Sequence, residues 1–254
     1  MSINNETKLQ IIKDVIPLLE KSIYMFCDKI SKPSWITDKD NTFPRYQNPI
    51  SLHFQILQAI RIVSGLNASV CLLNSGYTQE TGVIVRTIEE FLSKIMFVHE
   101  AHIKGHRTTE QQRLIDEYFK YDIRSTKDIL EGNDFWVNMN KVYASFARIL
   151  AGGTKNSDVY NVQRKLRALY DAYSGYVHGF YPHIMEMYEG GTERFRINGM
   201  RGTPRIKEMI GPIASCVVRT LNTLSLIAKS LQLSELEKEL IDRRKKFCES
   251  EAYK

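Results

Sequence analysis

The segment around YDAYSGYVHGF, residues 170–180, combines side chains that could do acid–base chemistry with the spacing of a helix. On a helical wheel four polar residues fall on one side. They are Arg167, Asp171, Ser174 and His178. A guanidinium can bind a phosphate, and an imidazole titrates near neutral pH and can move protons. The alternative is a solvated helix face on which Arg167 and Asp171 form a surface ion pair.

The other side of this segment carries an apolar stripe that predicts packing against the core. The stripe consists of Val162, Leu166, Leu169, Tyr173, Val177 and Phe180. Two glycines, Gly175 and Gly179, interrupt the segment, and a glycine inside a helix costs about 1 kcal/mol relative to alanine. We therefore expect another backbone or a ligand to approach closely at these glycines.

A second helical segment, VIVRTIEEFLSKIMFVHE at residues 83–100, is apolar over much of its circumference and should pack on more than one face. Arg86 and Glu90 lie four residues apart and could form a surface ion pair of little energetic value. Alternatively, Arg86 or Glu89 points across a helix interface toward His178. In that case the two helices together would build a site.

Three histidines, His99, His102 and His106, would share one face if the same helix continued to residue 106. Imidazoles at this spacing can bind zinc or nickel. Gly105 predicts that the helix ends there, and histidines in a last turn also complement the helix dipole. We therefore predict no metal and no cofactor.

The segment ERFRINGMRGTPRIK, residues 193–207, is the most basic stretch with aromatic neighbours. Its cations are Arg194, Arg196, Arg201, Arg205 and Lys207. Guanidinium groups bind backbone phosphates and aromatic rings stack on unpaired bases, so the segment predicts nucleic-acid binding. The alternative is an exposed basic hairpin whose charge prevents edge-to-edge aggregation.

Helical periodicity dominates the rest of the chain and predicts an all-α fold. We expect an N-terminal helix interrupted or kinked near Pro17, a long loop over residues 32–50, and an antiparallel pair of helices at 50–75 and up to about residue 104. Further helices are expected at 107–131, at 134–150, around the opening segment and within 205–254. Gly-Gly and Asn-Gly pairs predict a small β-hairpin near 185–200.

The composition is that of an ordinary globular protein, with 254 residues, 43% apolar and 25% charged, and a net charge of +6. No apolar run approaches the length that crosses a bilayer and the N-terminus is polar, so we expect a cytoplasmic protein that does not engage a membrane. The four cysteines lack metal or redox spacing. Phosphate-binding glycine loops, nucleophile elbows and zinc-protease motifs are absent.

Two stretches carry a family resemblance: VIVRTIEEFLSKIMFV at residues 83–98 and YSGYVHGFYP at residues 173–182. An Arg-x-x-Glu helix followed later by a Tyr-Ser-x-x-Val-His element resembles a group of uncharacterised bacterial helical proteins that is similar, more distantly, to the HEPN superfamily. The resemblance implies an antiparallel helical bundle over about residues 50–185, frequently dimeric. The hairpin at 186–204 and the helices at 205–254 would extend this single domain.

Active HEPN proteins are metal-independent endoribonucleases of toxin and phage-defence systems, so the resemblance implies an RNA-directed protein. Their catalytic arginine precedes the histidine by four to six intervening residues. His178 matches that histidine, but the corresponding arginine positions hold Asp171, Ala172 and Tyr173. Either another arginine reaches His178 in space, or the chain has no ribonuclease activity.

Two hypotheses follow. In the first, a homodimeric RNA-directed protein uses His178 as general acid/base, Arg86 or Arg167 as phosphate ligand and Glu89 as orienting group, while the 194–207 segment holds the RNA backbone. In the second, a non-catalytic helical module uses the polar row and the basic hairpin to hold a partner protein or a nucleotide. RNA cleavage by this chemistry needs a base near the ribose 2′-hydroxyl and a cation on the phosphate.

Overall fold

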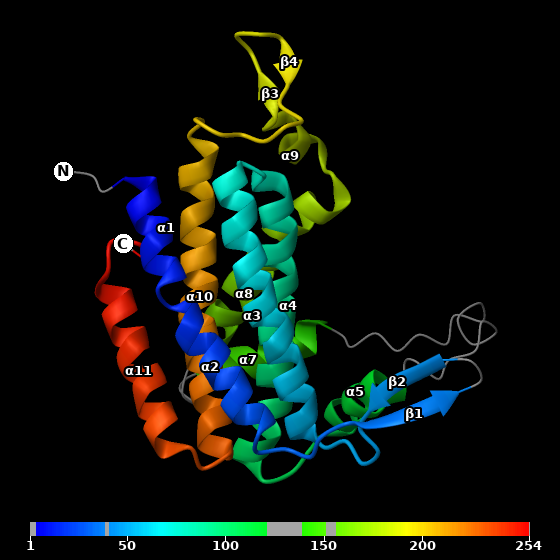
Figure 1. Ribbon diagram of the computed structural model, residues 1–254. Coiled ribbons are helices and arrows are strands. Elements are labelled where there is room, and N and C mark those ends of the chain that lie inside the picture. Colours follow the sequence, from blue (N-terminus) through cyan, green and yellow to red (C-terminus); the bar gives the residue numbers. More distant parts are fainter. Residues whose placement is uncertain (1–3, 39–40, 121–138, 151–155, 254) are drawn as a thin grey trace.

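The computed structural model describes residues 4–38, 41–120, 139–150 and 156–253. In these residues the fold is all-α, as predicted, with two small two-stranded sheets (Figure 1). The elements are α1 (Asn5–Lys13), α2 (Ile16–Cys27), β1 (Ser34–Asp38), β2 (Asn41–Arg45), α3 (Ser51–Ser75), α4 (Thr78–Lys104), α5 (Thr109–Lys120), α7 (Met139–Leu150), α8 (Asn156–His178), α9 (Tyr181–Met185), β3 (Tyr188–Glu189), β4 (Arg194–Phe195), α10 (Arg205–Ser230) and α11 (Ser234–Glu249).

The N-terminal segment is interrupted near Pro17, one of the two predicted forms, and so consists of two helices, α1 and α2. Pro17 lies in the first turn of α2, where its missing N–H leaves no hydrogen bond unmade. The break between α1 and α2 therefore falls just before the proline that predicted it.

The prediction of a structureless loop over residues 32–50 is wrong. Antiparallel strands β1 and β2 pair there, with Trp35 opposite Pro44 and Ile36 opposite Phe43. Aromatic and β-branched residues favour extended pairing, and a proline is tolerated in a two-stranded sheet because each strand has a free edge.

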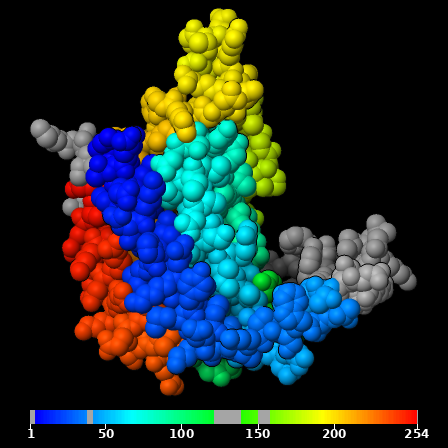
Figure 2. Space-filling model, viewed as in Figure 1, coloured from blue at the N-terminus to red at the C-terminus, as the bar shows by residue number. Residues whose placement is uncertain are grey.

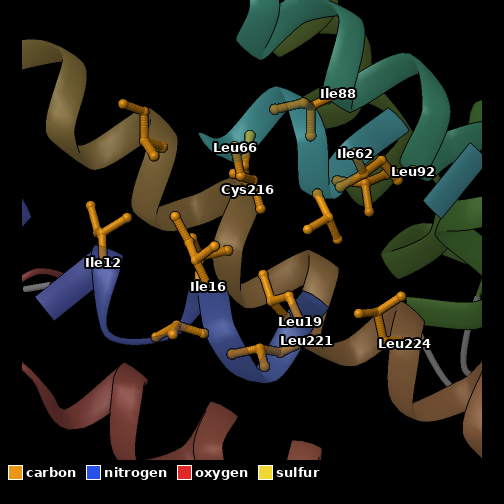
Figure 3. Packing of buried hydrophobic residues seen from close by; sticks show 14 of the residues in the cluster. Ile12, Ile16, Leu19, Ile62, Leu66, Ile88, Leu92, Cys216, Leu221 and Leu224 are labelled. Carbon is orange, nitrogen blue, oxygen red and sulfur yellow. The ribbon is translucent and has the colours of Figure 1, made fainter. Parts of the chain in front are cut away.

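The centre of the bundle consists of α3, α4 and α10 (Figure 1). Helices α1, α2 and α11 cover one side, and their apolar residues interlock with those of the central helices; Figure 3 shows Ile12, Leu19 and Leu221 in this layer. Helices α7 and α8 pack on α4, where a smaller cluster includes Met96, Phe146 and Leu166. As predicted, α4 is packed on several faces.

Helix ends follow the glycine pattern of the sequence. Gly76 ends α3 and Gly105 ends α4, both in the left-handed conformation, with φ of 89° and 72°. The histidine run therefore leaves the helix before His106. Residues 121–138 and 151–155, which contain the predicted divisions between helices at 131–134 and before α8, lie outside the described residues.

Between α8 and α10 the chain leaves the bundle and builds a projection, residues 179–204, which we term the tip. It contains α9 and the β3–β4 hairpin, in which Tyr188 pairs with Phe195 and Glu189 with Arg194. The predicted small β-hairpin is thus confirmed. In the space-filling view the β3–β4 hairpin projects from the helices below it (Figure 2).

Helices α3 and α10 are each long and apolar enough to cross a membrane, with mean hydropathies of 1.6 and 1.4. In the bundle, 50% and 61% of the most apolar stretch of α3 and α10, respectively, is buried. The core helices of soluble bundles can be as long and as apolar, so length and hydropathy do not by themselves identify α3 and α10 as membrane-spanning helices. The cytoplasmic location and the absence of membrane contact remain predictions.

Candidate functional site at the α4–α8 interface and the tip

One face of α4 carries hydrogen bonds and ion pairs that link this helix to α8, to α10 and to the base of the tip. Its residues are spaced three or four apart and so fall in one row. They are Gln79, Gly82, Arg86 and Glu89, with Glu90 beside them. The last turns of α8 and the middle of α10, the two helices that flank the tip, are thus both bonded to the same helix.

Arg86 crosses the interface to α8, one of the two alternatives that the sequence left open, but it does not reach His178. Its Nε donates to Ser174 Oγ at 3.3 Å, and its guanidinium carbon lies 3.4 Å from the centre of the Tyr170 ring. The Nη1 group donates to Glu90 at 3.0 Å. With 9% of its side chain exposed, Arg86 is committed to the helix interface.

Glu89 faces α10 rather than His178. Both of its carboxylate oxygens accept hydrogen bonds from the guanidinium of Arg219, and Cys216 Sγ donates to it at 3.2 Å. Burial and then the charge of Glu89 raise the pKa of the Cys216 thiol well above its usual value. The predicted role of Glu89 as orienter of His178 therefore has no contact to support it.

The polar row on α8 divides into an inner and an outer part. Ser174 turns inward to Arg86, whereas Arg167 and Asp171 form an exposed ion pair of 3.9 Å, with 62% and 65% of their side chains exposed. Arg167 also donates to Asn140 at 3.0 Å. These two residues thus match the solvated-face alternative.

His178 is exposed at the last position of α8. Its ring stacks on Phe180 with a centroid separation of 5.9 Å and an interplanar angle of 26°. Across the described residues, no hydrogen bond or ion pair joins it to any other side chain. The imidazole is therefore accessible, but no arginine accompanies it within the described part of the chain.

Gly175 in α8 and Gly179 just after it are required for different structural reasons. A Cβ on Gly175 would lie 2.0 Å from the His183 ring, so Gly175 permits the close approach that we predicted. Gly179 instead has φ +60°, and the N–H of Phe180 donates to the carbonyl of Gly175 at 3.0 Å. This is the geometry of a Schellman helix end, which favours glycine.

Glu186 connects the tip to three helices. It accepts hydrogen bonds from Gln79 at 3.1 Å and from the Tyr176 hydroxyl at 3.3 Å, and it pairs with Arg205 at 3.7 Å. Burial and then the charge of Glu186 raise the pKa of Tyr176 to about 12. Gly82 leaves room for the Tyr176 ring, because a Cβ there would lie 2.5 Å from it.

The far end of the tip is fixed to the end of α3. Met200 N–H donates to the carbonyl of Gly76 at 2.6 Å, and a Cβ on Gly199 would lie 2.9 Å from the carbonyl oxygen of Ser75. Gly199 has φ +95°, which favours glycine. Together with the Glu186 contacts, these bonds hold both ends of the tip against the bundle.

Much of the predicted basic patch is neutralised by nearby carboxylates. Arg196 pairs with Glu189, and Arg205 pairs with Glu186 and Glu208. In the part of the chain that the structure describes, the cations of this segment without an acidic partner are Arg194, Arg201 and Lys207. The patch therefore offers fewer available charges to a polyanion than its sequence indicates.

The tip region is unusually apolar for an exposed surface. Seven of the fifteen large apolar side chains exposed among the described residues lie between residues 177 and 197. They are Val177, Phe180, Tyr181, Ile184, Tyr188, Phe195 and Ile197. The prediction that the whole stripe is core is thus wrong at Leu169, Val177 and Phe180, because the packing of α8 on α4 and α7 leaves these side chains exposed.

The histidines at the end of α4 do not form a metal centre in the described residues, where no group of three or more metal-ligating side chains occurs. His99 and His102 lie side by side, with ring centroids 5.6 Å apart, and His106 contacts the carbonyl of Lys104. Burial, and then the neighbouring charges of His102 and Lys229, lower the pKa of His99 to about 4.

Sequence reasoning missed Arg219, Glu186, His183 and the buried carboxylate Glu100. Glu100 accepts hydrogen bonds from Ser145 and from Arg148; although burial opposes ionisation, these bonds lower its pKa to about 2. Arg219 could have been noticed, because it is an isolated charge among apolar residues of a core helix. Glu186 and His183 carry no comparable signal.

Comparison with protein-family models, with curated proteins and with solved structures finds no match to this chain. The relationship to the HEPN superfamily therefore remains a prediction, and function is argued from the site alone.

Proposed function

We propose that the protein is RNA-directed and binds RNA where α8 meets the tip. The observation that carries the proposal is the stacking of the exposed His178 ring on the exposed Phe180 at the start of the tip, a segment that adds further exposed rings and, with the start of α10, three cations without acidic partners among the described residues. Cations contact phosphates, rings stack on bases, and an imidazole is the side chain best suited to proton transfer near neutral pH. The HEPN-like motif supports the same proposal.

The proposed chemistry is cleavage through the ribose 2′-hydroxyl. His178 would take the proton of that hydroxyl as its oxygen attacks phosphorus, and the bond to the 5′-oxygen would break, with that oxygen taking up a proton. The products would be a 2′,3′-cyclic phosphate and a 5′-hydroxyl. No metal is required, but a cation must stabilise the charge on the phosphate.

The missing part is that cation. Arg86 is held in the helix interface by Ser174 and Tyr170. Arg167 lies eleven residues before His178 on the same helix, a separation of about 16 Å along its axis, which is too long for one shared phosphate oxygen. The cleavage proposal therefore requires a guanidinium from elsewhere, and a second copy of the chain in the predicted homodimer is its proposed source.

The experiment is cleavage of tRNA and mRNA by the purified protein in the presence of a metal chelator. We expect products ending in a cyclic phosphate from the wild type and none from His178→Ala, while Asp171→Asn, on the same helix face, retains activity. If the wild type and His178→Ala show the same background, the catalytic part of the proposal is lost. RNA binding would then decide whether the protein is RNA-directed at all.

A second candidate function is a non-catalytic module that holds a partner protein. The observation that favours it is the engagement of Arg86 and Glu89 in core ion pairs, beside a tip with many exposed apolar side chains. Large exposed apolar patches commonly mark interaction sites. This candidate gains support if the purified protein neither binds nor cleaves RNA at low salt.

A further inference from the structure

The exposed rings of the tip region occur in pairs whose members support each other. His178 stacks on Phe180, and Tyr188 meets Phe195 edge to face with centroids 5.3 Å apart. Tyr181, between the pairs in sequence, is 76% exposed. A ring held by a neighbour keeps its orientation and can present a face to a ligand without further loss of freedom.

The surface that bears these rings is fixed before any ligand arrives. Glu186 links the tip to α4, α8 and α10, and Met200 links it to the end of α3. His183 packs into the space left by Gly175 and meets the Tyr176 ring at 4.4 Å. A pre-organised surface pays little ordering entropy on binding.

The charges around the rings are few. Arg196 and Arg205 are paired with carboxylates of the same region, which leaves Arg194, Arg201 and Lys207 without acidic partners among the described residues. A surface that relied on phosphate contacts would need more available cations than this. Apolar contact must therefore supply most of the affinity.

From these three observations we propose that the tip is a platform for unpaired bases, and that its ligand is single-stranded RNA bound mainly by stacking. This inference rests on the proposed function and specifies its ligand and binding mode. The bases of an A-form duplex are stacked inside the helix and cannot reach protein rings, whereas the bases of a single strand can. The three cations would contact the backbone between stacked bases.

This binding mode predicts an unusual salt dependence. Single strands lose affinity with a logarithmic slope of about −0.7 for each phosphate contact, so three cations give a slope of about −2. A clamp using all five basic residues of the 194–207 segment would give about −3.5 by the same relation. The slope thus reports whether stacking or charge dominates.

The test is fluorescence anisotropy with a labelled, unstructured RNA of about 12 nucleotides, a length suited to one small binding surface. The comparison ligands are the same RNA as a duplex and inorganic polyphosphate, which has the charge but no bases. The variants are Phe180→Leu and Phe195→Leu. Tyr24→Leu is the matched control, because Tyr24 is 72% exposed on α2, away from the tip.

We expect the single strand to bind at least tenfold more tightly than the duplex or polyphosphate, with a slope near −2. Each phenylalanine variant should weaken binding about fivefold or more, the lower bound for loss of one stacked base, and Tyr24→Leu should have no effect. Circular dichroism confirms that each variant is folded.

Two results would overturn the inference in different ways. Equal binding of duplex and single strand, or unchanged affinity of both phenylalanine variants, removes the stacking platform but leaves an RNA-directed protein. Failure to bind any of the three ligands at low salt removes the platform together with the proposed function, and it favours a protein partner at the tip.

Discussion

Arg86 Nε donates to Ser174 Oγ at 3.3 Å across the interface of α4 and α8. The guanidinium carbon of the same side chain lies over the Tyr170 ring, 3.4 Å from its centre. One turn further along α4, Glu89 binds Arg219 of α10. Two successive turns of α4 thus bind α8 and α10, the two helices that the tip connects. Arg86 and Glu89, which the sequence suggested as partners of His178, thus link the helices that flank the tip.

Replacing Arg86 by methionine should lower the free energy of unfolding by about 2 kcal/mol, because the apolar stem is kept but the bonds to Ser174 and Glu90 and the contact with Tyr170 are lost. Urea denaturation measures this change. Arg167→Met is the matched control, since its ion pair is exposed and should contribute no more than about 0.5 kcal/mol. An equal effect of both variants would contradict the structural role of Arg86.

Glu89→Gln should cost about 3 kcal/mol, because it leaves the buried guanidinium of Arg219 without a carboxylate. Adding Arg219→Met in the same chain should recover part of this loss, since the unpaired charge is then gone. Glu239→Gln, which breaks the exposed pair with Lys21, serves as control and should change stability by less than about 0.5 kcal/mol. Simple additivity of the Glu89 and Arg219 variants would show that the two residues do not interact.

The fold class and most helix positions could be predicted because they depend on local signals. The apolar period marks α3, α4 and α10, and Gly76 and Gly105 mark where helices end. The β1–β2 hairpin could not be predicted in this way. Its prolines and turn-forming residues predict a loop. The two strands become evident only in the structure, where Trp35 pairs with Pro44 across the turn.

The candidate site was only partly predictable, because a helical wheel gives directions but not distances or partners. It left open whether Arg86 lies at the surface or faces another helix, and it could not show which turn of α8 the side chain would meet. It also could not show that Val177 and Phe180 are surface residues despite their core spacing, because exposure depends on which neighbouring elements cover a side chain. The ion pair between Arg205 and Glu186 also could not be predicted, because it depends on how the tip packs against α10.

Gly175→Ala should loosen the tip, because its Cβ would lie 2.0 Å from a His183 ring that is held by the Ala172 carbonyl and by Tyr176. We expect faster hydrogen exchange and faster proteolysis within residues 179–204, with little change in the central helices. Gly190→Ala is the control in the same tip, since nothing lies within 4 Å of its added Cβ. Unchanged exchange in the tip of Gly175→Ala would show that His183 does not fix it.

The stability of the fold should fall as the pH is lowered from about 6.5 to about 4, because of His99. Burial lowers its folded pKa to about 4, so over this window the unfolded chain binds a proton that the folded chain does not. The sign is therefore a loss of stability with falling pH. The full effect is about 3 kcal/mol and is complete once the pH is below the folded pKa.

The measurement is urea denaturation at several pH values for the wild type and His99→Leu. Nδ1 of His99 has no hydrogen-bond partner among the described residues, so leucine removes the titration without breaking a bond at that atom. We expect the variant to lose most of the pH dependence above pH 5, where the ordinary titration of carboxyl groups contributes little. His106→Gln, at an exposed position, should keep the wild-type dependence, and a wild-type slope that persists in His99→Leu would assign the effect to another group.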